Sequence, residues 1–137
     1  VHRLDKDTSG LMVVAKNDAA QVSLSRQIKA QSQTKGYLAL VEGHLHPPQG
    51  AIEAPLGRDP LRRQRMAVVA RGREARTEYK VMRYLPGHTF LEVTPRTGRT
   101  HQIRVHLAHL GYPILGDTVY GNSKLPKNLP IFRQAFY

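Results

Sequence analysis

The sequence predicts an α+β domain built on a mixed, mainly antiparallel β-sheet with flanking helices. Residues 75–85 and 89–95 alternate apolar and polar side chains, as expected for two antiparallel strands that bury one face. Two other segments carry apolar residues at helical spacing and begin at residue types that cap helices, Asn17 and Thr100. The 137 residues suffice for one domain with its own core.

The first half of the chain predicts two strands, a helix and a loop. Residues 11–15 are an apolar run rich in β-branched side chains, which predicts a buried strand. Asn17 is expected to cap a helix that runs to about residue 30 or 32 and carries a thin apolar stripe. Residues 35–41 predict a second strand, and the paired prolines within residues 44–49 predict a loop.

Shorter elements lie between this loop and the two long strands. Ile52 and Leu56 indicate a short strand ahead of the basic segment 58–65. Residues 66–69 predict another short strand, and the glycine within residues 71–73 predicts a turn.

The last predicted helix begins at Thr100 and ends at Gly111. We expect it to place three apolar side chains, Ile103, Leu107 and Leu110, on one buried stripe. The remainder, residues 112–137, is rich in Gly and Pro and predicts irregular structure.

The composition favours a polyanionic partner. Lys and Arg number 21 against 10 Asp and Glu, a formal net charge of +11. Residues 58–65 are either an RNA-gripping loop or a solvated basic hairpin. No apolar stretch reaches membrane-spanning length, and the absence of cysteine excludes disulfides and thiolate metal sites. We expect a cytoplasmic, monomeric protein with no membrane partner.

Two metal-site patterns are present only in part. The spacing of Asp5, Asp7 and Ser9 imitates the start of a calcium loop, but Lys16 occupies the position where a bidentate glutamate belongs. Three histidines lie in the second helix, His101, His106 and His109, without the spacing or cysteines of a zinc site. We therefore expect no metal, and interpret these histidines as facing nucleic acid or solvent.

Four ordered motifs resemble those of the RluA-type pseudouridine synthases. Their residues are most similar to those of the RluD branch, which acts on ribosomal RNA. The first is His2-Arg3-Leu4-Asp5-Lys6-Asp7-Thr8-Ser9-Gly10, and the second is Lys35-Gly36-Tyr37. The third runs from Thr97 to His106, and the fourth combines Pro113-Ile114-Leu115-Gly116-Asp117 with Tyr120-Gly121. Charged groups crowded before an apolar run independently favour a positioned carboxylate, with Asp5 as the candidate.

The resemblance implies an isomerase that converts uridine to pseudouridine in structured RNA without a cofactor. It also implies that residues 1–137 are part of a catalytic domain whose sheet is incomplete at both ends. Large-subunit ribosomal RNA is the expected substrate. The alternatives are a synthase directed to transfer RNA and a basic RNA-binding module without catalysis.

The resemblance further implies roles for individual residues. Asp5 would be the catalytic carboxylate, as nucleophile or base, and Arg104 would pair with it and favour its ionised form. Tyr37 would lie against the uracil, and Arg3 would help to displace the target nucleotide. The remaining expected substrate contacts are Arg99, His101 and Gln102.

Overall fold

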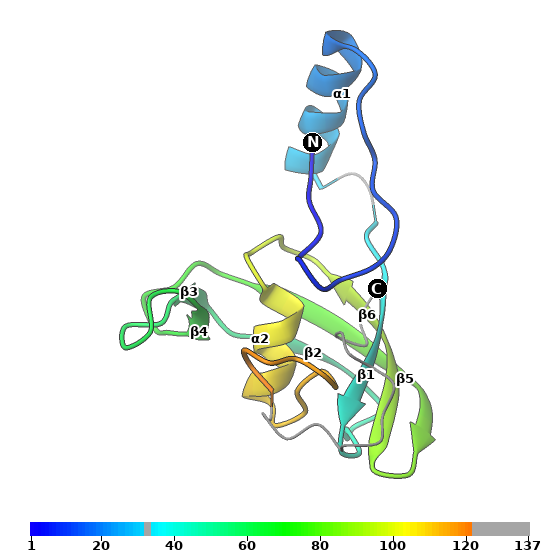
Figure 1. Cartoon of the computed structure of the whole chain (residues 1–137), viewed down its shortest axis with the longest axis vertical. Helices are drawn as coiled ribbons and strands as arrows, with labels where there is room; N and C mark the ends of the chain where they lie inside the picture. Colours follow the sequence, from blue (N-terminus) through cyan, green and yellow to red (C-terminus); the bar gives the residue numbers. More distant parts are fainter. Residues whose placement is uncertain (32–33, 122–137) are drawn as a thin grey trace.

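A four-stranded antiparallel sheet forms the centre of the computed structural model, which describes residues 1–31 and 34–121 (Figure 1). The strand order is β1-β6-β5-β2, and β3 and β4 form a separate two-stranded ribbon. The strands are β1 (Tyr37–Glu42), β2 (Gln49–Glu53), β3 (Leu56–Arg58), β4 (Met66–Val68), β5 (Arg76–Leu85) and β6 (His88–Pro95), and the helices are α1 (Asp18–Lys29) and α2 (Gln102–His109). The predicted α+β class is confirmed.

The two long strands, β5 and β6, lie in the middle of the sheet and supply much of its core. Tyr79, Leu91 and Val93 are buried on one face, whereas Lys80 and Glu92 on the other face are exposed. This alternation confirms the predicted antiparallel pair with one buried face. The predicted strands over residues 35–41 and 66–69 appear as β1 and β4, and the turn before β5 is also present. Ile52 and Leu56, predicted to share one short strand, lie in two strands of different sheets, β2 and β3.

Helix α2 is buried on two sides because it lies between the sheet and the β3–β4 ribbon (Figure 1). Ile103 and Leu107 join the core of the sheet, whereas Val105 packs in a second cluster under the ribbon. Leu110 lies beyond the helix and is 41% exposed, so its predicted place on the buried stripe is wrong. Gly111, at φ +94°, terminates the helix as predicted.

The N-terminus of α2 differs from the prediction. The residue at the N-cap is His101, in the left-handed region at φ 55°, and no side chain caps the helix from that position. Thr100 is therefore not the cap. The Gln102 carboxamide oxygen instead accepts hydrogen bonds from the Thr97 hydroxyl (2.7 Å) and the Arg99 backbone N–H (3.1 Å), which fixes the preceding turn.

His106 does not face nucleic acid or solvent, contrary to the prediction. Its side chain is fully buried, with Nδ1 2.7 Å from the Thr77 hydroxyl and Nε2 2.9 Å from the carbonyl oxygen of Ala54. The ring thus links α2 to the sheet and to the segment after β2. Burial lowers the pKa of His106, so the neutral form is favoured in the core. His109 is exposed, as expected.

Helix α1 projects away from the sheet in Figure 1 and has no buried residue. Its predicted cap is confirmed, because the Asn17 side chain accepts the N–H of Ala20 at 2.8 Å. The buried strand predicted for residues 11–15 is absent, and Leu11 is 94% exposed. None of the described strands pairs with this segment, so its backbone joins no ladder.

The end of the described chain is irregular, as predicted. Residues 112–121 form turns and a single bridge between Ile114 and Val41. The rest of that prediction, residues 122–137, lies outside the described residues. Within the described ranges no helix is long and apolar enough to cross a membrane.

Candidate active site

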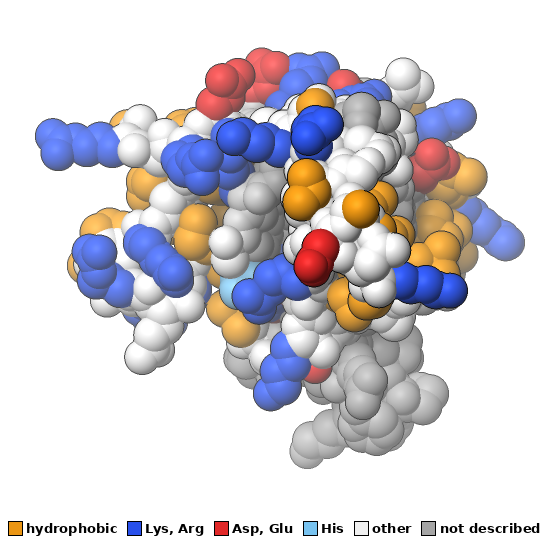
Figure 2. All heavy atoms as spheres, turned by 90° about the horizontal axis from the view of Figure 1, so that it is seen from above, with side chains coloured by type: hydrophobic (Ala, Val, Ile, Leu, Met, Phe, Trp, Pro, Cys, Tyr) orange, Lys and Arg blue, Asp and Glu red, His pale blue; other side chains and the backbone are white. Residues whose placement is uncertain are grey.

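A cavity of about 590 Å³ lies where the N-terminal segment meets the start of β1 and the start of α2. All seven residues predicted for the site line it: Arg3, Asp5, Tyr37, Arg99, His101, Gln102 and Arg104. Lys35 and Arg58 add two further cations. Figure 2 shows Lys and Arg side chains bordering a hollow on the face seen from above. An anionic ligand would therefore meet mostly positive charge at the mouth of this cavity.

Asp5 and Arg104 are in contact although 99 residues separate them in the sequence. The Arg104 guanidinium donates from Nη1 to Oδ2 of Asp5 at 3.3 Å. Arg104 is nearly buried, whereas the Asp5 side chain is 23% exposed and faces the cavity. The predicted pairing is confirmed, and it leaves the Asp5 carboxylate accessible to a ligand while balancing its charge.

Arg104 has a second and closer carboxylate partner, Asp117. Nε and Nη2 of Arg104 donate to the two oxygens of Asp117 at 2.8 and 3.1 Å, in a bidentate pair. Burial alone would raise the pKa of Asp117, but the hydrogen bonds and charge of Arg104, together with the backbone N–H groups of Tyr120 and Val119, outweigh it and the net pKa is lowered. The guanidinium is thus held by Asp117 through Nε and Nη2 and presents Nη1 to Asp5.

Residues 117–121 form a tight turn that holds Asp117 in place. Oδ1 of Asp117 accepts the N–H groups of Val119 and Tyr120 at 3.0 and 3.1 Å. A Cβ on Gly121 would lie 2.4 Å from the Asp117 carbonyl oxygen, so only glycine fits there. The Tyr120 ring lies under the Arg104 guanidinium, 4.9 Å from Cζ to the ring centroid.

Tyr37 is half-buried at the start of β1 and lines the same cavity as Asp5. Burial and then the negative charge of Asp5 raise the pKa of Tyr37, so its hydroxyl stays protonated at neutral pH. Arg3 is exposed at the edge of the cavity. The structure therefore places an aromatic ring and a cation on the wall of the cavity that Asp5 also lines.

Arg99 and Gln102 have extensive contacts within the protein. Arg99 donates from Nε to the carbonyl oxygen of Glu74 at 2.8 Å. Gln102 is buried, and its amide donates to the carbonyl oxygen of Arg76 and the hydroxyl of Thr77 at 2.9 Å each. Together with the two bonds that its oxygen accepts, this leaves the Gln102 side chain fully paired. These four bonds indicate that Gln102 holds the wall of the cavity in place rather than binding a ligand.

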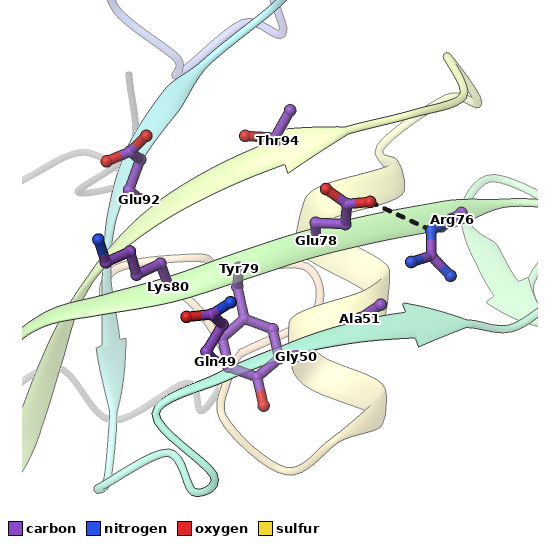
Figure 3. A pocket seen from close by; sticks show the side chains of 9 residues that line it. All are labelled: Gln49, Gly50, Ala51, Arg76, Glu78, Tyr79, Lys80, Glu92 and Thr94. Atoms are coloured by element: carbon purple, nitrogen blue, oxygen red, sulfur yellow. Dashed lines mark hydrogen bonds and ion pairs between the residues drawn. The ribbon is translucent and has the colours of Figure 1, made fainter.

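Sequence reasoning did not assign a site role to Asp117 or Tyr120. Both belong to the fourth motif, which was the available signal. A second hollow lies between β2, β5 and β6, on the face of the sheet that is opposite to α2 (Figure 3). Glu78 bonds Arg76 at 3.3 Å and Arg96 at 2.9 Å, and Arg76 also pairs with Glu53, so two cations are matched by two carboxylates. No cluster of potential metal ligands occurs among the described residues.

Comparison with known sequences identifies the family. The sequence pattern of RNA pseudouridylate synthases matches residues 1–109. A protein of Chloroflexus aurantiacus named as an uncharacterized RNA pseudouridine synthase is 58% identical over 122 residues, which are 88% of this chain and 38% of that protein. Ribosomal large subunit pseudouridine synthase D of Nitrosomonas europaea is 52% identical over 123 residues, which are 90% of this chain and 36% of that protein. The chain thus spans less than half the length of these relatives.

Solved structures are similar as well. Human RNA Pseudouridylate Synthase Domain Containing 1 superposes with a TM-score of 0.87 at 34% identity, covering 98% of this chain and 59% of the human one. Human RNA Pseudouridylate Synthase Domain Containing 4 gives a TM-score of 0.75 at 29% identity, covering 95% and 55%. On the sequence pattern, the relatives and the fold, the chain belongs to the RNA pseudouridylate synthase family.

Proposed function

We propose that the intact protein isomerises uridine to pseudouridine in RNA and that its substrate is large-subunit ribosomal RNA. The observation that carries the proposal is the Asp5 carboxylate, bonded to the buried Arg104 and open to a cation-lined cavity. A protein that only binds phosphates has no use for a carboxylate at that point, because it repels them. Kinship with a synthase named for the large ribosomal subunit supports the choice of RNA.

The reaction requires few chemical groups beyond those that these residues would supply. The bond between N1 of uracil and C1′ of ribose breaks, and a bond between C5 and C1′ forms. The hydrogen on C5 leaves as a proton, and N1 gains one. Asp5 would attack C1′ as a nucleophile or remove a proton from the sugar, and either role needs the ionised carboxylate that Arg104 favours. Tyr37 would stack on the extruded uracil, with its hydroxyl in the protonated form.

The direct test is release of tritium from RNA that carries [5-³H]uridine. The intact protein, incubated with large-subunit ribosomal RNA or with transfer RNA, should release tritium in proportion to the pseudouridine formed. Release from ribosomal RNA alone supports the proposal in full. Release from transfer RNA alone would change the substrate, and binding without release from either would favour the non-catalytic RNA-binding module.

The β3–β4 ribbon supplies a basic rim to the proposed RNA interface. Asp59 accepts the N–H groups of Leu61 and Arg62 at 2.9 and 3.2 Å and bonds Nε of Arg65 at 2.9 Å, which shapes the connecting loop. Arg62 and Arg63 are exposed in this loop, and neither takes part in an ion pair of the described chain. They are therefore available to phosphates, with Arg58 behind them at the cavity.

Replacing Arg62 and Arg63 together by alanine should weaken RNA binding by about tenfold at physiological salt. It should also make log K against log salt shallower by roughly 1.4 to 1.8, since two phosphate contacts would be lost. Binding measured over a series of salt concentrations checks both. The matched control removes two exposed cations of β5 that do not line the cavity, Lys80→Ala with Arg83→Ala. An equal loss in both double variants would show that net charge alone sets the affinity.

A further inference from the structure

The Tyr120 hydroxyl lies between two elements that border the cavity. It accepts the backbone N–H of Met66 at 3.0 Å and lies 2.7 Å from Nδ1 of His101. The two rings also meet edge to face, with centroids 5.5 Å apart. Tyr120 therefore connects the β3–β4 ribbon to the residue that opens α2, and it does so through a single hydroxyl group.

The bonding pattern favours one tautomer of His101. The hydroxyl already accepts a bond from Met66 and has one proton to give, so it donates most simply to an unprotonated Nδ1. A neutral imidazole with a bare Nδ1 carries its proton on Nε2. His101 lines the cavity, and no described residue of the chain bonds its Nε2. That N–H is consequently available to a ligand.

The charges around His101 also favour the neutral ring. Burial lowers the pKa of His101, and the cations of Arg104 and Arg3 lower it further, whereas the carboxylates of Asp5 and Asp117 act in the opposite direction. The net direction is downward. A neutral N–H donor suits an uncharged oxygen better than a phosphate, which an imidazolium would bind more strongly.

We propose that Tyr120 is a positioning residue that holds His101 as a neutral Nε2–H donor to a carbonyl oxygen of the uracil in the cavity. The identity of the ligand rests on the proposed function, but the tautomer and its dependence on Tyr120 do not. The Tyr120 hydroxyl would thus act on the substrate through His101, whereas the Tyr120 ring contacts Arg104. The turn of residues 117–121 would then position two side chains of the cavity. Asp117 orients Arg104, and Tyr120 would orient His101.

The test uses Tyr120→Phe in the intact protein labelled with ¹⁵N-histidine. Phenylalanine keeps the ring under Arg104 and removes only the hydroxyl. Long-range ¹H–¹⁵N correlation spectra, with His101 assigned through His101→Gln, should show a bare Nδ1 and a protonated Nε2 in the unmodified protein. In Tyr120→Phe the two tautomers should mix, and the pH midpoint of His101 should rise. Tyr112→Phe is the control, since no described residue bonds the Tyr112 hydroxyl.

Activity supplies the second measurement. Tyr120→Phe should lower kcat/KM for tritium release by about tenfold, the effect of one neutral hydrogen bond, and Tyr112→Phe should leave it unchanged. A protonated Nδ1 in the unmodified protein, or a His101 spectrum that Tyr120→Phe leaves unaltered, would overturn the positioning role. Unchanged kcat/KM despite an altered spectrum would overturn the contact with uracil. Absence of tritium release from every RNA would instead refute the proposed function and leave the tautomer result standing.

Discussion

Asp5→Asn should reduce tritium release from uridine-labelled RNA by about 10⁴-fold or more while leaving RNA affinity largely intact. Asparagine has nearly the shape of aspartate, and its carbonyl oxygen can still accept the N–H that Arg104 donates at 3.3 Å. The amide can neither attack C1′ nor remove a proton, so the chemical step loses its reacting group. Single-turnover tritium release and equilibrium RNA binding, measured on the same preparations, separate the two effects.

The matched control is Asp7→Asn in the same turn. Asp7 also carries a carboxylate, but it does not line the cavity. Its replacement removes the same charge from the same segment and should leave tritium release close to that of the unmodified protein. Near-normal release by Asp5→Asn would refute the catalytic assignment, and an equal loss in both variants would indicate that the turn had changed shape.

The elements that the sequence predicted correctly are those whose signals are local. Helix α1 begins where Asn17 can cap it, and β5 and β6 follow an alternation of side chains that any antiparallel pair with one buried face must have. Gly111 ends α2 because the required positive φ favours glycine. In each case the few residues around the element contain the physical cause.

The errors concern what lies against an element. His106 and Leu110 exchange their expected environments, because His106 bonds Thr77 of β5 and Ala54 after β2, whereas the helix ends at His109, before Leu110. Residues 11–15 have the composition of a buried strand, but a strand also needs a neighbour with which to pair. Helical periodicity does not report which residues pack against each side of a helix. In the same way, β propensity does not report whether a neighbouring strand is there to pair with.

The site shows the same division. No local pattern joins Asp5 to Arg104 across 99 residues, and the pairing was predicted through the family resemblance alone. The Arg104–Asp117 pair and the bond between Tyr120 and His101 depend on a turn that follows α2 and folds back on it. The motif marked that turn, but only its tertiary contacts reveal that it holds the guanidinium.

Asp117→Ala should lower the free energy of unfolding by about 3 to 5 kcal/mol, the cost of breaking a buried ion pair. Arg104 would keep only its single bond to Asp5, and the N–H groups of Val119 and Tyr120 would lose their acceptor. Denaturant titration of the intact protein measures the change. Asp59→Ala is the comparison, because Asp59 also bonds an arginine and two backbone N–H groups. Its partner Arg65 is 34% exposed, so the loss should be much smaller.

The pH dependence of stability gives this prediction a second signature. Because the pKa of Asp117 is lower in the folded protein than its ordinary value of 3.8, the unfolded chain binds the proton more readily. The stabilisation from Asp117 is therefore complete above that value and is lost as pH falls through the folded pKa. Asp117→Asn cannot titrate, so the difference in unfolding free energy between it and the unmodified protein should shrink at low pH. A difference that stays constant down to the acid limit would show that the bidentate pair with Arg104 does not stabilise the fold electrostatically.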